Sequence, residues 1–135
     1  MTKKDLQEYY WLQRNIQKLE DKLLELETKA TKITTYITDE PKSTNNNSDK
    51  ISNVVMKIIE VQQRINKQLE KSYEILRKIE EAIEILPERE RYLIRLRYID
   101  CKSWEQIAVD MNYSWQHIHK IHSDALKLLA RKRCE

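Results

Sequence analysis

Apolar residues recur every three or four positions through the first part of the chain, with charged and amide residues between them. Such a spacing places the apolar side chains on one face of an α-helix. The series predicts a helix from about residue 3 to 35, and its members are Tyr9, Leu12, Ile16, Leu19, Leu23, Leu26, Ala30 and Ile33. Because the spacing continues for about four heptads, we expect this helix to pack along its length against another helix.

A second series with the same spacing predicts a helix over about residues 49–85. Its members are Ile51, Val55, Ile58, Gln62, Ile65, Leu69, Ser72, Leu76, Ile79, Ile83 and Leu86. Residues 37–48, which precede it, contain Pro41 and three consecutive asparagines, a composition that predicts a loop. Two helices of similar length joined by such a loop favour an antiparallel, coiled-coil-like hairpin.

The second series is wider than one partner helix requires. The apolar residues beside it are Val54, Ile59, Val61 and Ile75. Polar residues within such a series, here Gln62 and Ser72, cost stability and help to fix register. We therefore expect residues 1–86 to form an oligomerisation region, in which these helices build a homodimer or a higher homo-oligomer.

The pattern changes at Pro87, which stops the long helix and suits the first turn of a new one. Residues 87–98 then predict a short helix with four residues available for burial, Leu93, Ile94, Leu96 and Tyr98. Ser103 and Gln106, three positions apart, have the form of a capping box, so a further helix is expected to begin there.

Asn112 indicates a tight turn after that helix, because asparagine tolerates the left-handed conformation better than other non-glycine residues. Ser114 can cap the helix that follows. Residues 103–122 thus have the spacing of a helix-turn-helix. The expected fold class is all-α, with the helical hairpin of residues 1–86 followed by a helix-turn-helix domain over residues 87–135.

The helix that begins at Ser114 has an apolar face and a polar face at about 100° per residue. Its core-facing residues are Ile118, Ile121, Ala125, Leu128 and Leu129. Outward residues in the first turns of such a helix contact base edges in the major groove, and here Gln116 could pair with adenine and Lys120 with guanine. The candidate base-reading residues are Trp115, Gln116, His117, His119 and Lys120. The candidate phosphate contacts are Lys102, Ser103, Ser114, Lys127, Arg131, Lys132 and Arg133.

All three histidines of the chain, His117, His119 and His122, fall in this helix, which raises the question of a metal site. Zinc ligands on one helix are best placed four residues apart, whereas these are two and three apart. No carboxylate or cysteine lies beside them in sequence. We therefore expect no metal ion and no cofactor, and DNA contact is the preferred interpretation of the exposed histidines.

Catalysis is not expected either, because the sequence contains no nucleophile–base pair or paired carboxylates. Cys101 has no histidine close in sequence and is interpreted as a free thiol, like Cys134. The absence of glycine disfavours β-rich folds and glycine-rich phosphate loops. The N-terminal MTKKDLQEYY lacks the apolar segment of a signal peptide, and no apolar run approaches a membrane span, so a cytoplasmic protein is expected.

The net charge of +3 is unevenly distributed. Residues 1–86 contain 15 basic and 15 acidic residues, whereas residues 87–135 contain 10 basic and 7 acidic ones. The whole excess therefore lies in the C-terminal third, which favours a polyanionic partner there, and double-stranded DNA is the one expected.

The C-terminal third resembles region 4 of bacterial σ70-type factors. LPERERYLIRLRYID resembles the family's "LPxRER…LR(Y/F)" helix, and SWEQIAVDMNYSWQHIHKIHSDALKLL resembles its helix-turn-helix. The matching residues are Leu86, Pro87, Arg89, Glu90, Arg91, Leu96, Arg97, Tyr98, Ser103, Trp104, Glu105, Ile107, Ala108, Ser114, Ile118, Ile121, Ala125, Leu126 and Leu129. The resemblance covers about 50 of the 135 residues. It implies DNA binding and names RNA polymerase as a further candidate partner.

The sequence also departs from the family's pattern. Asn112 stands at the family's usual glycine, Trp115 at its arginine, and Gln116 and His119 replace glutamate and arginine at base-reading positions. The −35 promoter sequence is therefore not the expected target. A helical hairpin stands in place of σ region 2, and this layout is similar to small phage regulators of the ArpU and RinA type. That similarity implies a late-gene transcriptional activator in a bacterial host cell.

Two other functions remain open. A phage DNA-packaging recognition subunit also combines a helix-turn-helix with an oligomerising hairpin, but it would form a ring of many subunits. A protein-binding module that mimics region 4 would bind RNA polymerase or another helical partner and no DNA. A mass measurement and a DNA-binding assay separate both from a sequence-specific regulator that reads DNA with residues 114–133.

Overall fold

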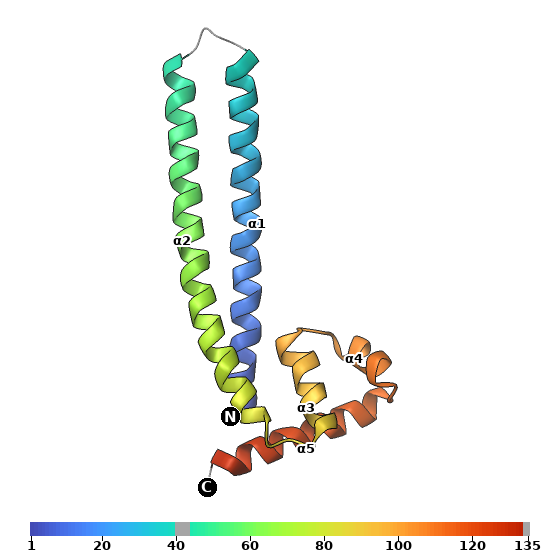
Figure 1. The fold of residues 1–135 in the computed structure, drawn as a ribbon. Helices are drawn as coiled ribbons and strands as arrows, with labels where there is room; N and C mark the ends of the chain where they lie inside the picture. Colours follow the sequence, from blue (N-terminus) through green and yellow to red (C-terminus); the bar gives the residue numbers. More distant parts are fainter. Residues whose placement is uncertain (40–43, 134–135) are drawn as a thin grey trace. The chain divides into compact units, whose positions relative to one another are not determined.

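The computed structural model describes the backbone of residues 1–39 and 44–133 and the side chains of residues 1–34 and 49–131. Within these ranges all regular structure is helical, which confirms the all-α fold. The elements are α1 (Lys3–Asp39), α2 (Thr44–Ile83), α3 (Glu88–Ile94), the π-helical η1 (Arg95–Ile99), α4 (Trp104–Met111) and α5 (Trp115–Arg133) (Figure 1). No described helix is long and apolar enough to cross a membrane.

The loop predicted over residues 37–48 is largely helical, so that prediction was wrong. α1 continues to Asp39 and α2 begins at Thr44, while residues 40–43 lie outside the described part of the chain. Three threonines near the end of α1 bond to the helix's own backbone. The hydroxyls of Thr28, Thr31 and Thr34 each donate to the carbonyl four residues earlier, at 2.9 Å.

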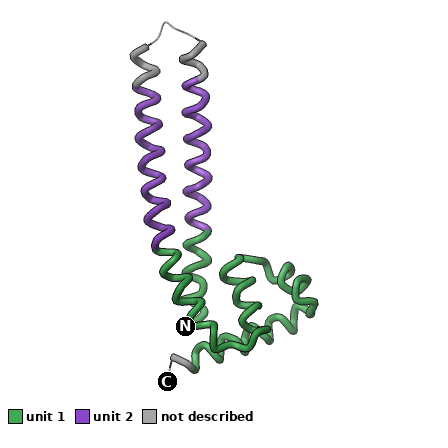
Figure 2. The backbone as a smooth tube through the Cα atoms, in the orientation of Figure 1, with its two compact units in different colours: residues 1–13, 71–135 green, residues 14–70 purple. Residues whose placement is uncertain are grey.

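The chain forms two compact units (Figure 2), and residues 14–70 make up one of them. There α1 and α2 lie side by side and antiparallel, as the hairpin prediction required (Figure 1). Their shared core consists of Leu26, Val61 and Ile65, with Leu19, Leu23, Ile58 and Leu69 packed against it.

The buried face of α2 in this unit is shifted from the expected series. Val54 and Val61 are buried, whereas Val55 and Gln62, which the series included, are exposed. The series through Val54, Ile58, Val61 and Ile65 is apolar throughout, so burying it avoids placing an amide between the helices. The shift leaves Val55, Met56 and Ile59 exposed on α2.

The second unit comprises residues 1–13 and 71–135. Its core combines the ends of the two long helices with the C-terminal helices, and its buried members are Leu6, Tyr9, Ile79, Ile83, Leu86, Leu93, Ile94, Leu96, Tyr98, Ile107, Ile118, Ile121, Ala125 and Leu129. The four apolar residues expected to be buried in 87–98 are among them. The domain boundary predicted at residue 86 remains a prediction. The compact unit also includes residues 1–13 and 71–86, because the ends of α1 and α2 supply part of its core.

A buried polar pair lies within that core. The Tyr98 hydroxyl and His122 Nε2 are 2.6 Å apart, and His122 is only 6% exposed. Burial raises the pKa of Tyr98 to about 12. Burial, with smaller effects of Lys3, His119 and Arg97, lowers the pKa of His122 to about 4. Both groups are therefore neutral at pH 7, and one donates a hydrogen bond to the other.

Acid should destabilise the protein through His122. Between pH 6.5 and about 4 the unfolded chain binds a proton at this histidine that the folded chain excludes, so this contribution is complete above pH 6.5 and is lost as pH falls towards 4. We expect a loss on the order of 2 kcal/mol by pH 4.5. Thermal unfolding at pH 7 and 4.5 measures it. His122→Gln should reduce the difference between the two midpoints, whereas the exposed His117→Gln should retain it; equal behaviour of the two variants would refute the assignment.

Candidate nucleic-acid interface

Local hydrogen bonds fix the start of α4. The Gln106 backbone N–H donates to Ser103 Oγ at 3.2 Å, and the Ser103 N–H donates to Gln106 Oε1 at 3.0 Å. These two bonds form the capping box expected from the sequence. They satisfy backbone donors that a helix start otherwise leaves unpaired.

The turn between α4 and α5 has the predicted form. Asn112 is left-handed, with φ 58° and ψ 43°, and ends α4. The Tyr113 N–H donates to the Ala108 carbonyl at 3.1 Å. Ser114 Oγ then accepts from the His117 N–H at 3.1 Å and caps α5. The chain thus reverses in three residues between the two helices, and this confirms the helix-turn-helix.

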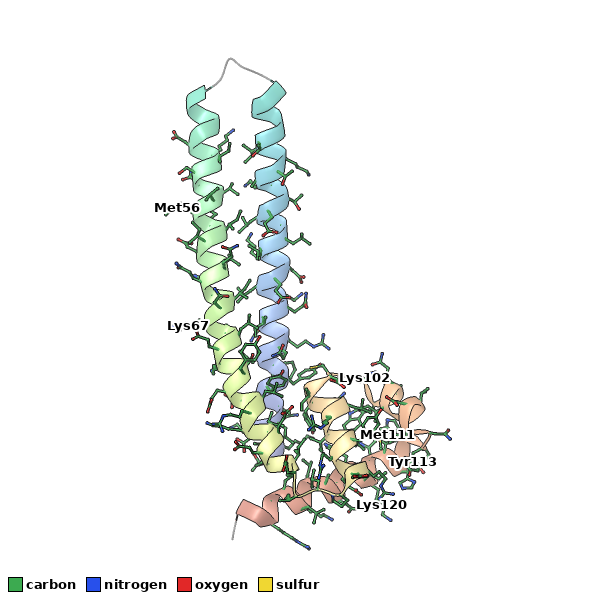
Figure 3. The ribbon with its side chains drawn as sticks, viewed as in Figure 1. Met56, Lys67, Lys102, Met111, Tyr113 and Lys120 are labelled. Atoms are coloured by element: carbon green, nitrogen blue, oxygen red, sulfur yellow. The ribbon has the colours of Figure 1, made fainter. Side chains whose placement is uncertain are left out.

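The outward face of α5 is solvent-accessible. Gln116, His117 and Lys120 are exposed, and Trp115 is 55% exposed. The opposite face is buried by Ile118, Ile121, Ala125 and Leu129, with Leu128 only partly buried. Figure 3 shows Lys120 on α5 and Tyr113 at the turn before it. Four of the five candidate base-reading residues are therefore accessible at the start of this helix.

His119, the fifth candidate, is only partly exposed. Its ring centroid lies 3.9 Å from that of Trp115 and 4.4 Å from that of Trp104. Its Nε2 atom is buried and has no hydrogen-bond partner among the described residues. Trp104 also contacts the ring of His122, at 4.8 Å. A series of rings thus connects the exposed Trp115 with the buried Tyr98–His122 pair.

The candidate phosphate contacts lie in separate places. Lys102 and Ser103 immediately precede α4, whereas Ser114 caps α5 and Lys127 and Arg131 lie more than two turns further along that helix. In Figure 3, Lys102 and Lys120 appear on different sides of the C-terminal helices. Lys127 and Arg131 are exposed, and Lys102 is partly buried. The side chains of Lys132 and Arg133 are outside the described part of the chain.

Arg97 and Trp104, for which no site role was predicted, pack together beside this surface. The Arg97 guanidinium carbon lies 4.4 Å from the centroid of the Trp104 ring, and its Nη1 donates to the Lys102 carbonyl at 3.0 Å. Arg97 lies in η1, where the wider π turn breaks the 3–4 spacing, so helical periodicity could not place it. Its match to the family's "LR(Y/F)" motif was the one available signal.

Two other side chains at the turn contact neighbouring residues. Tyr113 is 36% exposed, and its ring centroid lies 4.5 Å from that of His117. Asp110 accepts hydrogen bonds from the Tyr92 hydroxyl at both carboxylate oxygens, at 3.0 and 3.1 Å. Within residues 1–39 and 44–133, no cluster of histidine, cysteine or acidic residues could hold a metal ion.

The C-terminal helices match one known family. Residues 82–131, from the last turn of α2 into α5, match the family model described as Sigma-70, region 4. No curated protein and no solved structure matches this chain significantly. Domains of the matched type are regulatory rather than catalytic, and they bind DNA and RNA polymerase. The match supports the region 4-like helix-turn-helix and indicates DNA-binding transcription regulation in general.

Proposed function

We propose that this protein is a sequence-specific transcription regulator that reads the major groove of double-stranded DNA with α5. The observation that carries the proposal is the exposed, capped start of α5 within a helix-turn-helix that matches σ region 4. A side chain in the first turns of such a helix reaches base edges once the helix enters the groove. The C-terminal region 87–135 is the DNA-binding part in this proposal.

The base-reading roles follow from side-chain chemistry and exposure. Gln116 presents an amide that suits the N6 and N7 atoms of adenine, and Lys120 presents a donor for guanine. Trp115 and His117 border this surface and supply apolar and hydrogen-bonding contacts. His119 is partly buried between two indoles, so we assign it mainly to holding Trp115 in place, with a base contact limited to its exposed edge.

Backbone contacts surround the base-reading residues. The hydroxyls of Ser103 and Ser114 accept N–H groups in their caps and still have a proton to donate to phosphate. Ser114 adds the partial positive charge of the α5 N-terminus. The cationic members of the set are Lys102, Lys127, Arg131, Lys132 and Arg133. They would make binding weaker as salt rises.

Selection from a random duplex pool at near-physiological salt tests the function directly. The full-length protein should enrich one motif, and a dimer should enrich a two-fold symmetric one. Retention of DNA without enrichment would contradict sequence-specific reading. No retention at all, combined with binding to RNA polymerase, would favour a region 4 mimic that contacts protein alone.

Replacing Gln116 should change specificity, whereas replacing Lys127 should change affinity alone. Gln116→Ala removes a bidentate contact and should lower discrimination at one position by about 1–3 kcal/mol. Lys127→Ala, its control on the same exposed face, should weaken all sequences alike and reduce the salt slope by about 1. Competition binding with single-position site variants measures both. An unchanged preference in Gln116→Ala would remove it from the base-reading set.

The narrower biological role rests on the layout of the chain. A long helix pair before a region 4-like helix-turn-helix supports a phage late-gene activator of the ArpU and RinA type. Region 4 domains bind RNA polymerase as well as DNA, which supports polymerase as a second partner. In this role the selected motif would occur upstream of late phage genes.

We also propose that residues 1–86 mediate homo-oligomerisation. Support comes from Val55, Met56 and Ile59, which are exposed on α2 and take no part in the core that it shares with α1.

Met56→Glu should lower the mass in solution towards that of the monomer, because it places a charge in an apolar contact. Asn53→Glu adds the same charge at an exposed polar position and should leave the mass unchanged. Mass photometry separates a dimer from a ring of many subunits, which would instead favour a DNA-packaging role.

A further inference from the structure

A small cavity opens between the first turns of α1 and the start of α4. It lies within the compact unit of residues 1–13 and 71–135, and its volume is about 180 Å³. The residues that line it and enter the argument are Lys3, Gln7, Tyr10, Trp11, Arg97 and Trp104. Four of these six belong to α1, outside the segment that matches σ region 4.

The lining of the cavity is cationic and contains no carboxylate. Neither Lys3 nor Arg97 forms an ion pair with an acidic side chain in the described part of the chain. Both side chains, together with His119, contribute to the lowered pKa of the neighbouring His122. Positive charge therefore converges on this side of the unit, and the cavity suits an anion.

The two cations are presented differently. Arg97 is held in place, because its guanidinium lies over the Trp104 ring and donates to the Lys102 carbonyl. Lys3 is exposed in the first turn of α1. Gln7 lies one turn further along the same face and adds an amide that can donate to an oxygen. A fixed guanidinium, an exposed ammonium and an amide together suit a phosphate group.

The size of the cavity limits what it can hold. Pockets for cofactors and drug-sized ligands occupy about 300–1,000 Å³. The volume here, about 180 Å³, accommodates a phosphate with part of its sugar rather than a whole cofactor. The aromatic residues Tyr10 and Trp11 offer apolar surface for the sugar.

Trp104 connects the cavity with the proposed base-reading surface. Trp104 lines the cavity and also contacts His119, whose ring contacts that of Trp115 at the start of α5. In the major groove the first helix of a helix-turn-helix crosses the DNA backbone, and here that helix is α4, whose first residue is Trp104. A backbone phosphate of the same DNA is therefore the anion that this cavity would meet first.

We propose that this cavity binds a backbone phosphate of the duplex that α5 reads, so that Lys3 and Gln7 of α1 extend the DNA contact of the helix-turn-helix. The inference rests on the proposed function. It adds a DNA contact from α1, which lies outside the region 4-like segment.

Lys3→Gln tests the proposal, with Lys4→Gln as its matched control. The two lysines are adjacent, exposed and equally charged, but only Lys3 lines the cavity. Lys3→Gln should weaken binding to the selected duplex several-fold, equally for all sequences, and reduce the salt slope by about 0.9, whereas Lys4→Gln should leave both nearly unchanged. Fluorescence anisotropy over a salt series measures this, and thermal unfolding checks that both variants fold.

Gln7→Glu provides a second measurement, because it places a carboxylate where the phosphate would bind. It should weaken DNA binding several-fold. Its control, Asn15→Glu, adds the same charge at an exposed position of α1 outside the cavity and should weaken binding little. If wild type binds the selected duplex and neither Lys3→Gln nor Gln7→Glu differs from its control, the cavity contact is wrong while the proposed function stands. If wild type binds no duplex DNA, both are wrong.

The same cavity could instead bind a free anion. A third experiment distinguishes free phosphate from a phosphate of the DNA backbone. Trp11 and Trp104 line the cavity, so titration with inorganic phosphate can be followed by tryptophan fluorescence. The proposal expects at most millimolar binding of free phosphate together with Lys3-dependent DNA binding. Tight phosphate binding without any Lys3 effect on DNA would overturn the assignment to the duplex.

Discussion

The C-terminal helices depend on a hydrophobic core that they do not complete alone. α4 and α5 contribute Ile107, Ile118, Ile121, Ala125 and Leu129, but Leu6, Ile79 and Ile83 of the long helices belong to the same cluster. A domain of about 50 residues buries a smaller fraction of its surface on folding than a larger domain does, and is marginally stable by itself. The ends of α1 and α2 therefore act as additional core elements for the helix-turn-helix, and truncation at residue 86 would remove them.

The rings around Trp104 connect this core to the surface of α5. Tyr98 and His122 form a neutral hydrogen-bonded pair inside, Trp104 contacts His122 and His119, and Trp115 lies at the exposed end. Each ring restricts the rotamers of its neighbours because the contacts are close. The histidines of α5 thus have unequal roles: His122 is a core residue, His119 is part of the ring series, and His117 is exposed.

Much of this arrangement follows from local rules that the sequence displays. The capping serines, the left-handed Asn112 and the buried face of α5 depend on short-range chemistry, and the structure has all of them. The burial of His122 was not predictable, because it depends on Tyr98, 24 residues away. The cavity was missed for the same reason, since Lys3 and Arg97 are brought together only by tertiary packing. The helical residues on either side of 40–43 were missed because their polar composition resembles that of a loop.

The absence of glycine has a consequence for the backbone on either side of α4. Only two described residues have positive φ, Cys101 and Asn112, and they stand before and after α4. Each is a residue with a Cβ in a region that glycine would occupy freely, so its backbone has few alternative conformations. The conformational entropy of these turns is therefore lost when the protein folds and not when it meets a ligand. The turns around α4 are thus ordered before any ligand binds, and under the proposed function α5 would dock on DNA almost as a rigid body.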